Sequence, residues 1–234
     1  MFMLVIIYIN FITTFFLPKQ IKTTSGKQLI LKGNGPPVLF SPGLFGSMPV
    51  FLYNNLINEL KKNNTIITIN DFTPIAEDSV KEICNTIKVD KIGYIGHSSF
   101  NPNVINNNKY INSALLIDPI NIPFINFNSL SDNKIKTNYP ITIIKANKLY
   151  YGKKTLPEWQ NPNFEKIYKE IYCDGVGHPD ILDDFWADIA KSIGLWEMAE
   201  SKQMNYNNWT FNIKSDISQI RKKYIKYVAQ QYIN

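Results

Sequence analysis

The stretch that decides the fold is Ile92-Gly93-Tyr94-Ile95-Gly96-His97-Ser98-Ser99. It begins with a short apolar run over 92–95, which predicts a buried strand, and the glycine and serines that follow predict a sharp turn. Gly96, two residues before Ser98, puts no Cβ into that crowded turn. Because such a turn lifts a serine hydroxyl clear of the sheet edge, Ser98 is a candidate nucleophile.

Short apolar runs alternate with helical patterns on both sides of this stretch. Strands are predicted by a hairpin pattern over 20–32 and by runs at 38–40, 65–69, 114–117 and 141–146. Helices are predicted by apolar periodicity over 49–62, 78–87, 179–194 and 216–232. The alternation predicts an α/β fold, with a mainly parallel sheet flanked by helices on both faces.

Composition excludes several classes of protein. Apolar residues make up 44% of the 234 residues and charged residues 19%, which is too apolar for a disordered chain and too polar for a polytopic membrane protein. The net charge is +6, but Arg221 on the last predicted helix is the only arginine. A positive charge that comes almost entirely from lysine argues against nucleic-acid recognition and is typical of a solvated basic surface, which can attract anionic surfaces weakly.

Metal and redox sites of the cysteine type are also excluded. Cys84 and Cys173 are the only cysteines, and without a C-x-x-C motif the chain has neither a zinc ribbon nor a thioredoxin-type site. The two thiols are free core residues or form one disulfide.

The N-terminal segment is almost wholly apolar. Residues 1–17 read MFMLVIIYINFITTFFL, which is short for a membrane span of about 20 residues and lacks a basic region and a small-residue cleavage site. A leader, a membrane-surface anchor and an extra strand remain open. We divide the chain into a leader or anchor over 1–19 and one domain over 20–234. A leader or anchor implies secretion or membrane association, and a strand implies a cytoplasmic protein.

A nucleophilic serine needs a base, and the chain has two histidines. His97 adjoins Ser98 in a turn that should send the two side chains in different directions. The base is therefore expected to be His178, in the run Gly177-His178-Pro179-Asp180 before a predicted helix.

The base in turn needs an orienting carboxylate. No acid follows the predicted strand 141–146 within 147–150, but the preceding strand ends in Asp118-Pro119, on the edge where parallel sheets build sites. The chain order Ser98, Asp118, His178 suits this architecture. Glu158 and Asp174 are weaker candidates for the orienting carboxylate. The alternative for Asp118 is a structural role, in which it caps the turn before Pro119.

The developing oxyanion of an acyl transfer needs two donors. The glycine-rich loop 41–47 and the residue after the nucleophile offer the backbone N–H groups of Leu44 and Ser99. The same loop lacks the G-K-[ST] ending of a phosphate loop. The apolar residues after Asp118 are expected either to form a cover or an acyl pocket or to pack in the core: Phe124, Ile125, Phe127 and Leu130.

Together these motifs resemble the α/β-hydrolase superfamily over about residues 20–195. The resemblance rests on the runs Gly33–Val38, Ser41–Leu44, Gly96–Ser98, Asp118–Pro119 and Gly177–His178. Within the superfamily, Ser113 through Pro119 and Gly177 through Asp184 look like the chlorophyllase-type esterases, in which the acid follows the strand before the usual one. The resemblance implies hydrolysis of a small, apolar carboxylic ester, as in a lipase or esterase, without a metal or an organic cofactor.

Three departures from the family's pattern leave other functions open. The loop 41–43 has no histidine, Phe100 stands where a small residue is usual, and Pro102 leaves only a short helix after the elbow. A ring at Phe100 is expected to crowd that helix against the strand. A degenerate member that binds a ligand or membrane is therefore an alternative, as is an acyltransferase or thioesterase with the same triad.

Overall fold

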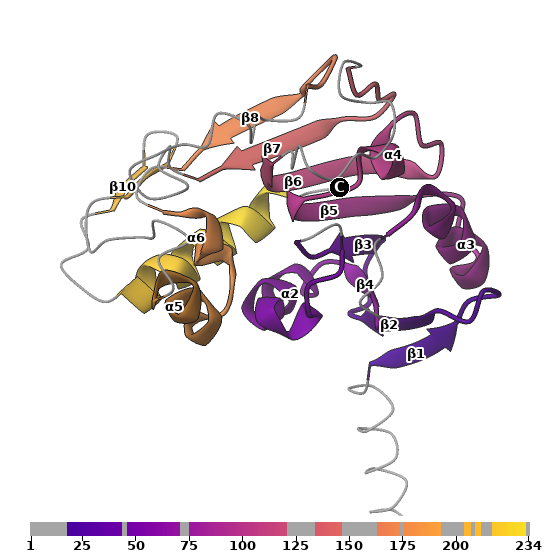
Figure 1. Ribbon diagram of the computed structural model, residues 1–234, viewed down its shortest axis with the longest axis horizontal. Helices are drawn as coiled ribbons and strands as arrows, with labels where there is room; N and C mark the ends of the chain where they lie inside the picture. The colour runs from indigo at the N-terminus through magenta and orange to yellow at the C-terminus, as the bar shows by residue number, and fades with distance from the viewer. Residues whose placement is uncertain are drawn as a thin grey trace, which may run out of the picture.

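An eight-stranded, mostly parallel sheet organises the described part of the chain (Figure 1). The computed structural model describes residues 18–43, 46–70, 75–120, 134–146, 163–173, 176–192, 204–206, 209–211 and 217–232. The strand order is β1-β2-β4-β3-β5-β6-β7-β8. The strands β3 to β8 pair in parallel, whereas β1 pairs antiparallel with β2 and β2 antiparallel with β4.

The bounds of the elements follow. The strands of the sheet are β1 (Lys19–Lys22), β2 (Gln28–Lys32), β3 (Pro37–Ser41), β4 (Thr65–Ile69), β5 (Ile92–Ser99), β6 (Ile111–Ile120), β7 (Ile141–Lys145) and β8 (Lys169–Tyr172). The helices are η1 (Val50–Tyr53), α2 (Asn54–Leu60), α3 (Glu77–Ile87), α4 (Pro102–Ile105), η2 (His178–Ile181), α5 (Asp184–Ser192) and α6 (Ile217–Gln231). A separate hairpin pairs β9 (Met204–Tyr206) with β10 (Trp209–Phe211).

Each face of the sheet has its own apolar core. Side chains of a strand alternate between the faces, so Ile95 of β5 packs with α2, α5 and α6, whereas Ile92 and Tyr94 pack with α3 and α4. Figure 1 shows α3 and α4 well apart from α5 and α6. Helices therefore cover both faces, and the predicted α/β architecture is confirmed.

The predicted elements are largely present, with one difference at an end of the sheet. The hairpin over 20–32, the strand 65–69 and the last helix are confirmed. The strand β8 was not predicted, because its four residues, KEIY, bury only Ile171. A four-residue run with one buried side chain leaves no periodic signal.

The predicted helix over 179–194 is wrong at its start. The chain forms a 3₁₀ turn over His178–Ile181, Leu182 is extended with ψ of 163°, and the α-helix begins only at Asp184. An extended residue cannot continue the helical hydrogen bonds, so the turn that carries His178 is separate from α5. Likewise, the predicted helix 49–62 is divided into η1 and α2 and ends at Leu60.

Phe100 does not crowd the strand, contrary to the expectation. Its ring is buried in the core under α3 and α4 and stacks on Phe164 at 6.4 Å between centroids. The helix α4 has only one turn, over Pro102–Ile105, as its proline predicted.

Cys84 and Cys173 are both buried thiols that form no disulfide, and they lie in the cores of opposite faces. The expectation of two core thiols is confirmed. Among the residues that the structure describes, no helix has the length and apolarity needed to cross a membrane. The apolar segment 1–17 lies outside those residues, so its role and the division of the chain at residue 20 stay predictions.

Candidate active site

Ser98 lies near the end of β5 in a strained backbone conformation. Its φ is 59°, in the left-handed region that side chains other than glycine rarely adopt. Strain of this kind persists only where the surrounding structure holds it, and it gathers at functional sites. The neighbouring loop approaches closely: a Cβ on Gly43 would lie 3.4 Å from the Ser98 Cβ and 2.8 Å from the Met48 Sδ. A Cβ at position 43 would therefore displace the flexible Met48 side chain and make van der Waals contact with Ser98.

A chain of hydrogen bonds joins the three candidate residues. The His178 Nε2 lies 2.9 Å from the Ser98 Oγ, and the His178 Nδ1 is hydrogen-bonded to the Asp118 Oδ2. The other carboxylate oxygen of Asp118 accepts from the Ala146 N–H at 3.2 Å. All three side chains are buried. The structure thus brings Ser98, Asp118 and His178 together from β5, β6 and η2.

This arrangement has the polarity that a serine nucleophile requires. The Asp118 carboxylate accepts the hydrogen of Nδ1, which leaves Nε2 as the acceptor for the Ser98 hydroxyl. Asp118 itself has a positive φ of 46°, which turns its side chain out of the regular alternation of β6. Because the strained residue bonds His178 and the Ala146 N–H, it does more than cap the turn before Pro119.

The predicted oxyanion donors are only partly described. Ser99 follows the nucleophile and is fully buried at the end of β5. Leu44 lies outside the described residues. The adjacent Gly43 N–H already donates to the Tyr53 hydroxyl at 3.0 Å, so it is not free for an oxyanion. The weaker acid candidates and the predicted cover also lie outside the described residues: Glu158, Asp174, Phe124, Ile125, Phe127 and Leu130.

His97 contributes to this site in a way that the sequence analysis missed. As expected, its ring does not bond the Ser98 hydroxyl. It stacks instead on the His178 ring, with centroids 4.7 Å apart, and bonds the His178 carbonyl and the Tyr53 hydroxyl. Burial lowers the pKa of His97 well below its ordinary value, and the neighbouring His178 adds to this effect. Its position two residues after Ile95 was a usable signal, since both must face the same side of β5.

The burial of Arg221 on the last helix was not predicted from the sequence. Its side chain is 2% exposed and its Nε donates to the Asp180 Oδ1 at 2.9 Å. The other Asp180 oxygen accepts from the Gly177 N–H at 2.7 Å. The last helix thereby holds both ends of the turn that carries His178.

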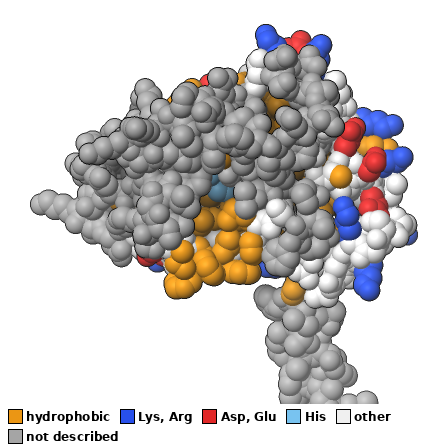
Figure 2. All heavy atoms as spheres, viewed as in Figure 1, with side chains coloured by type: hydrophobic (Ala, Val, Ile, Leu, Met, Phe, Trp, Pro, Cys, Tyr) orange, Lys and Arg blue, Asp and Glu red, His pale blue; other side chains and the backbone are white. Residues whose placement is uncertain are grey.

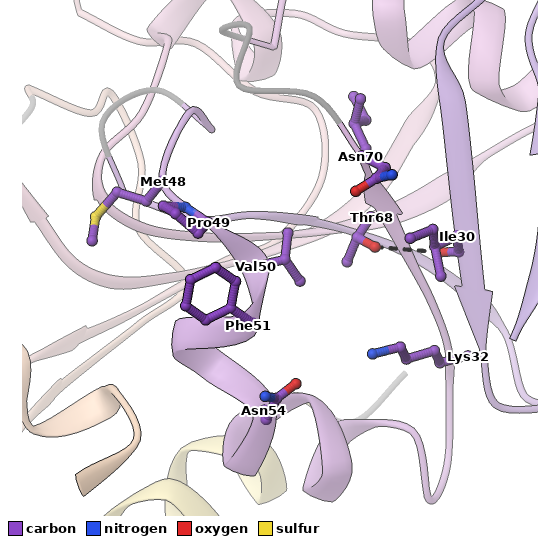
Figure 3. Close-up of a pocket in the computed structure, with 10 residues that line it drawn as sticks. Ile30, Lys32, Met48, Pro49, Val50, Phe51, Asn54, Thr68 and Asn70 are labelled. Atoms are coloured by element: carbon purple, nitrogen blue, oxygen red, sulfur yellow. Dashed lines mark hydrogen bonds between the residues drawn. The ribbon is translucent and has the colours of Figure 1, made fainter. Parts of the chain in front are cut away.

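Apolar side chains are exposed beside a histidine on one face of the molecule (Figure 2). Figure 2 shows a histidine side chain directly above an apolar surface patch. Exposed Phe51 and Phe185 both contact Trp186, at 5.6 and 4.9 Å between ring centroids. A pocket of about 220 Å³ opens between η1 and the strands β2 and β4 (Figure 3), and Met48, which touches Gly43, is part of its wall.

No metal site accompanies these residues. In the described part of the chain, no three histidine, cysteine, aspartate or glutamate side chains lie close enough together to hold an ion.

The topology and the elbow define the α/β-hydrolase fold. A strained serine lies near the end of a central parallel strand, and the acid and histidine come later in the chain in that order. No family model matches the sequence, and no curated protein does.

Several solved structures are similar to the chain. An epoxide hydrolase from an endophytic Streptomyces is 15% identical over 46% of this chain and 38% of its own, with a TM-score of 0.34. An epoxide hydrolase from Vigna radiata is 14% identical over 46% and 38%, with a TM-score of 0.33. A Bacillus subtilis protein assigned provisionally as a hydrolase is 10% identical over 79% and 95%, with a TM-score of 0.47. The alignments with the two epoxide hydrolases thus span less than half of those proteins.

Proposed function

We propose that the protein is a serine hydrolase that cleaves carboxylic esters. The observation that carries the proposal is the continuous hydrogen-bonded chain from the Ser98 Oγ through His178 to Asp118. The three residues are far apart in sequence and are buried together, Ser98 and Asp118 near the ends of the parallel strands β5 and β6 and His178 on the turn η2. Burying acid and base groups costs desolvation free energy, so such groups are rarely buried together without a function. Their convergence on a strained serine therefore supports a catalytic role.

The reaction proceeds in two halves. The Ser98 Oγ attacks the ester carbonyl while its proton passes to the His178 Nε2, and the tetrahedral intermediate collapses as the C–O bond to the alcohol breaks. The departing alkoxide takes the proton from His178. Water then attacks the acyl-enzyme carbonyl while its proton passes to the His178 Nε2. His178 returns that proton to the Ser98 Oγ as the carboxylic acid product leaves. Asp118 keeps the imidazole in the required tautomer and stabilises its charged form.

The oxyanion is assigned to the backbone N–H groups of Leu44 and Ser99. Removal of one such donor typically costs about 10²- to 10³-fold in rate. A backbone donor cannot be deleted by ordinary mutation, so this assignment is best tested through the residues that hold the loop.

The substrate class that we propose is a small apolar ester. Exposed Phe51 and Phe185, which both contact the half-buried Trp186, support it, because exposed apolar surface binds apolar ligands. The position of Asp118 on β6, one strand before β7, supports the likeness to the chlorophyllase-type esterases.

A fluorophosphonate probe tests the proposal directly. We expect stoichiometric labelling at Ser98, hydrolysis of short p-nitrophenyl esters, and loss of both in Ser98→Ala. Asp118→Asn should keep the fold and reduce kcat by about 10³- to 10⁴-fold, because the imidazole then adopts the wrong tautomer. Ser113→Ala is a matched control, since Ser113 bonds Tyr232 away from the site. A full rate in Ser98→Ala would refute the proposal, and a folded wild type that does not label would favour a ligand-binding member of the fold.

A further inference from the structure

His97 and Tyr53 link two segments next to Ser98: the glycine-rich loop at Gly43 and the turn that carries His178. The Gly43 N–H donates to the Tyr53 hydroxyl at 3.0 Å, and that hydroxyl lies 2.8 Å from the His97 Nδ1. The His97 Nε2 lies 3.3 Å from the His178 carbonyl oxygen. Four residues, from the loop after β3 and from η1, β5 and η2, therefore form one continuous path from the glycine-rich loop to the base.

The direction of every hydrogen in this path follows from its two ends. A carbonyl oxygen can only accept, so the His97 Nε2 must carry the hydrogen that it donates to His178. In neutral imidazole the Nδ1 is then a bare acceptor, and the Tyr53 hydroxyl must donate to it. The Tyr53 oxygen accepts in turn from Gly43. The path thus runs in one direction, from Gly43 to Tyr53 to His97 to His178.

Burial keeps Tyr53 and His97 in the protonation states that this direction requires. Tyr53 is fully buried, which raises its pKa above the ordinary value, so the hydroxyl keeps its hydrogen. The Tyr53 ring is fixed edge-on against Phe40 at 5.1 Å and His97 at 5.5 Å between centroids. A neutral His97 also places no like charge against the His178 ring that it stacks on.

We propose that Tyr53 and His97 are positioning residues, which fix the backbone of His178 and the loop at Gly43 relative to each other. The proposal rests on the hydrolytic function proposed above. It assigns neither residue to the chemistry itself, since neither bonds Ser98. Its physical basis is that an error of about 1 Å in the position of a reacting group can cost about 100-fold in rate.

The first test is kinetic. Tyr53→Phe removes one oxygen and keeps the ring, so the Gly43 N–H loses its acceptor and the His97 Nδ1 its donor. We expect kcat for a p-nitrophenyl ester to fall about ten- to hundredfold with KM within twofold of wild type. Tyr232→Phe is the matched control: Tyr232 is also buried and bonds Ser113, but lies outside the path, and kcat should not change. An unchanged kcat in Tyr53→Phe would overturn the proposal.

Substitutions of His97 separate positioning from packing. His97→Gln keeps an amide N–H that can reach the His178 carbonyl, whereas His97→Leu keeps volume without a donor. We expect the glutamine variant to retain at least tenfold more activity than the leucine variant at equal thermal stability. Equal activities in the two variants would show that His97 only fills space.

The second test does not depend on turnover. The chain has two histidines, so the ¹⁵N spectrum of its imidazoles contains only His97 and His178. We expect His97 to be the neutral Nε2–H tautomer throughout pH 5.5–8, and Tyr53→Phe to change its Nδ1 shift. A His97 in the Nδ1–H form, or one that titrates near 6.5, would overturn the path even in an inactive protein. Failure of the fluorophosphonate test would leave this result intact, so the two proposals can fail separately.

Discussion

The two faces of the sheet are packed by different chemistry. Under α3 and α4 the core is apolar and aromatic, and the buried polar side chains bond mainly to nearby backbone, as Asn108 does to the Val104 carbonyl. Under α2, α5 and α6 the apolar core also holds buried charge-bearing groups, of which Arg221 and Asp180 form an ion pair. The carboxylates, histidines and arginine that are buried in the described residues lie at the site or on this second face.

The difference indicates what each face does. Burying an ionisable group costs free energy unless it is paired and hydrogen-bonded, so a face that needs only stability has no reason to contain such groups. The second face includes them where they hold the turn 177–181. The first face supports the strands, and the second also positions the base.

The largest expected effect comes from breaking the ion pair on the second face. Arg221→Met leaves the Asp180 carboxylate buried without its cation, and we expect the free energy of unfolding to fall by about 3–5 kcal/mol. The double variant Asp180→Asn/Arg221→Met removes both charges and should cost less than the single change. Urea unfolding measures both values. Lys222→Met, at an exposed position of the same helix, is the control, with an expected change within about 0.5 kcal/mol. If Arg221→Met proved as stable as Lys222→Met, the proposed distinction between the two faces would be wrong.

A smaller effect is expected from an apolar truncation on the first face. Ile83 on α3 is 1% exposed, and Ile83→Ala should cost about 2–4 kcal/mol through lost contacts and a cavity. The kcat of the folded protein should not change, because α3 carries no residue of the site. The matched variant Ile57→Ala on α2, also 1% exposed, should lose similar stability and also lower kcat, because α2 follows Tyr53 directly. Equal losses of kcat in both variants would contradict the division.

The smallest effect is a pH dependence due to His97. Burial lowers its pKa in the folded state, whereas the unfolded chain has the ordinary value of about 6.5. Between those two pKa values the unfolded state binds more protons, so the free energy of unfolding rises with pH. The contribution of His97 is fully present above about pH 6.5 and is lost as the pH falls towards the folded-state pKa. One proton corresponds to a slope of up to about 1.4 kcal/mol per pH unit. Urea unfolding of wild type and His97→Gln between pH 5 and 7.5 should show this difference in slope, and identical slopes would refute it.

Much of the fold was predictable because strands of a covered parallel sheet are short apolar runs bounded by turn residues. The run 65–69 and the turn at Ser25-Gly26 are local signals, and the structure places β4 and the first hairpin there. Boundaries were harder to predict where a helical pattern spans two elements. Residues 179–194 have one amphipathic period, and only the extended Leu182 separates η2 from α5.

The candidate site was predictable to the extent that sheet topology implies neighbours. The order of Ser98, Asp118 and His178 along the chain implied that they could meet, and the structure brings them into hydrogen-bonding contact. Their catalytic role stays a proposal until the probe is applied. The residues around them, Tyr53 and Arg221, were not found, because nothing local distinguishes a buried tyrosine or arginine from an exposed one.

The sequence by itself therefore determined the alternation of strands and helices, the elbow at Gly96-His97-Ser98 and the identity of the three residues that meet there. Only the tertiary structure decided that His97 bonds Tyr53, 44 residues away, and that Arg221 is buried against Asp180, 41 residues away. The physical reason is that strand and turn patterns depend on neighbouring residues. The burial of a polar side chain depends instead on partners that only the folded chain brings within reach.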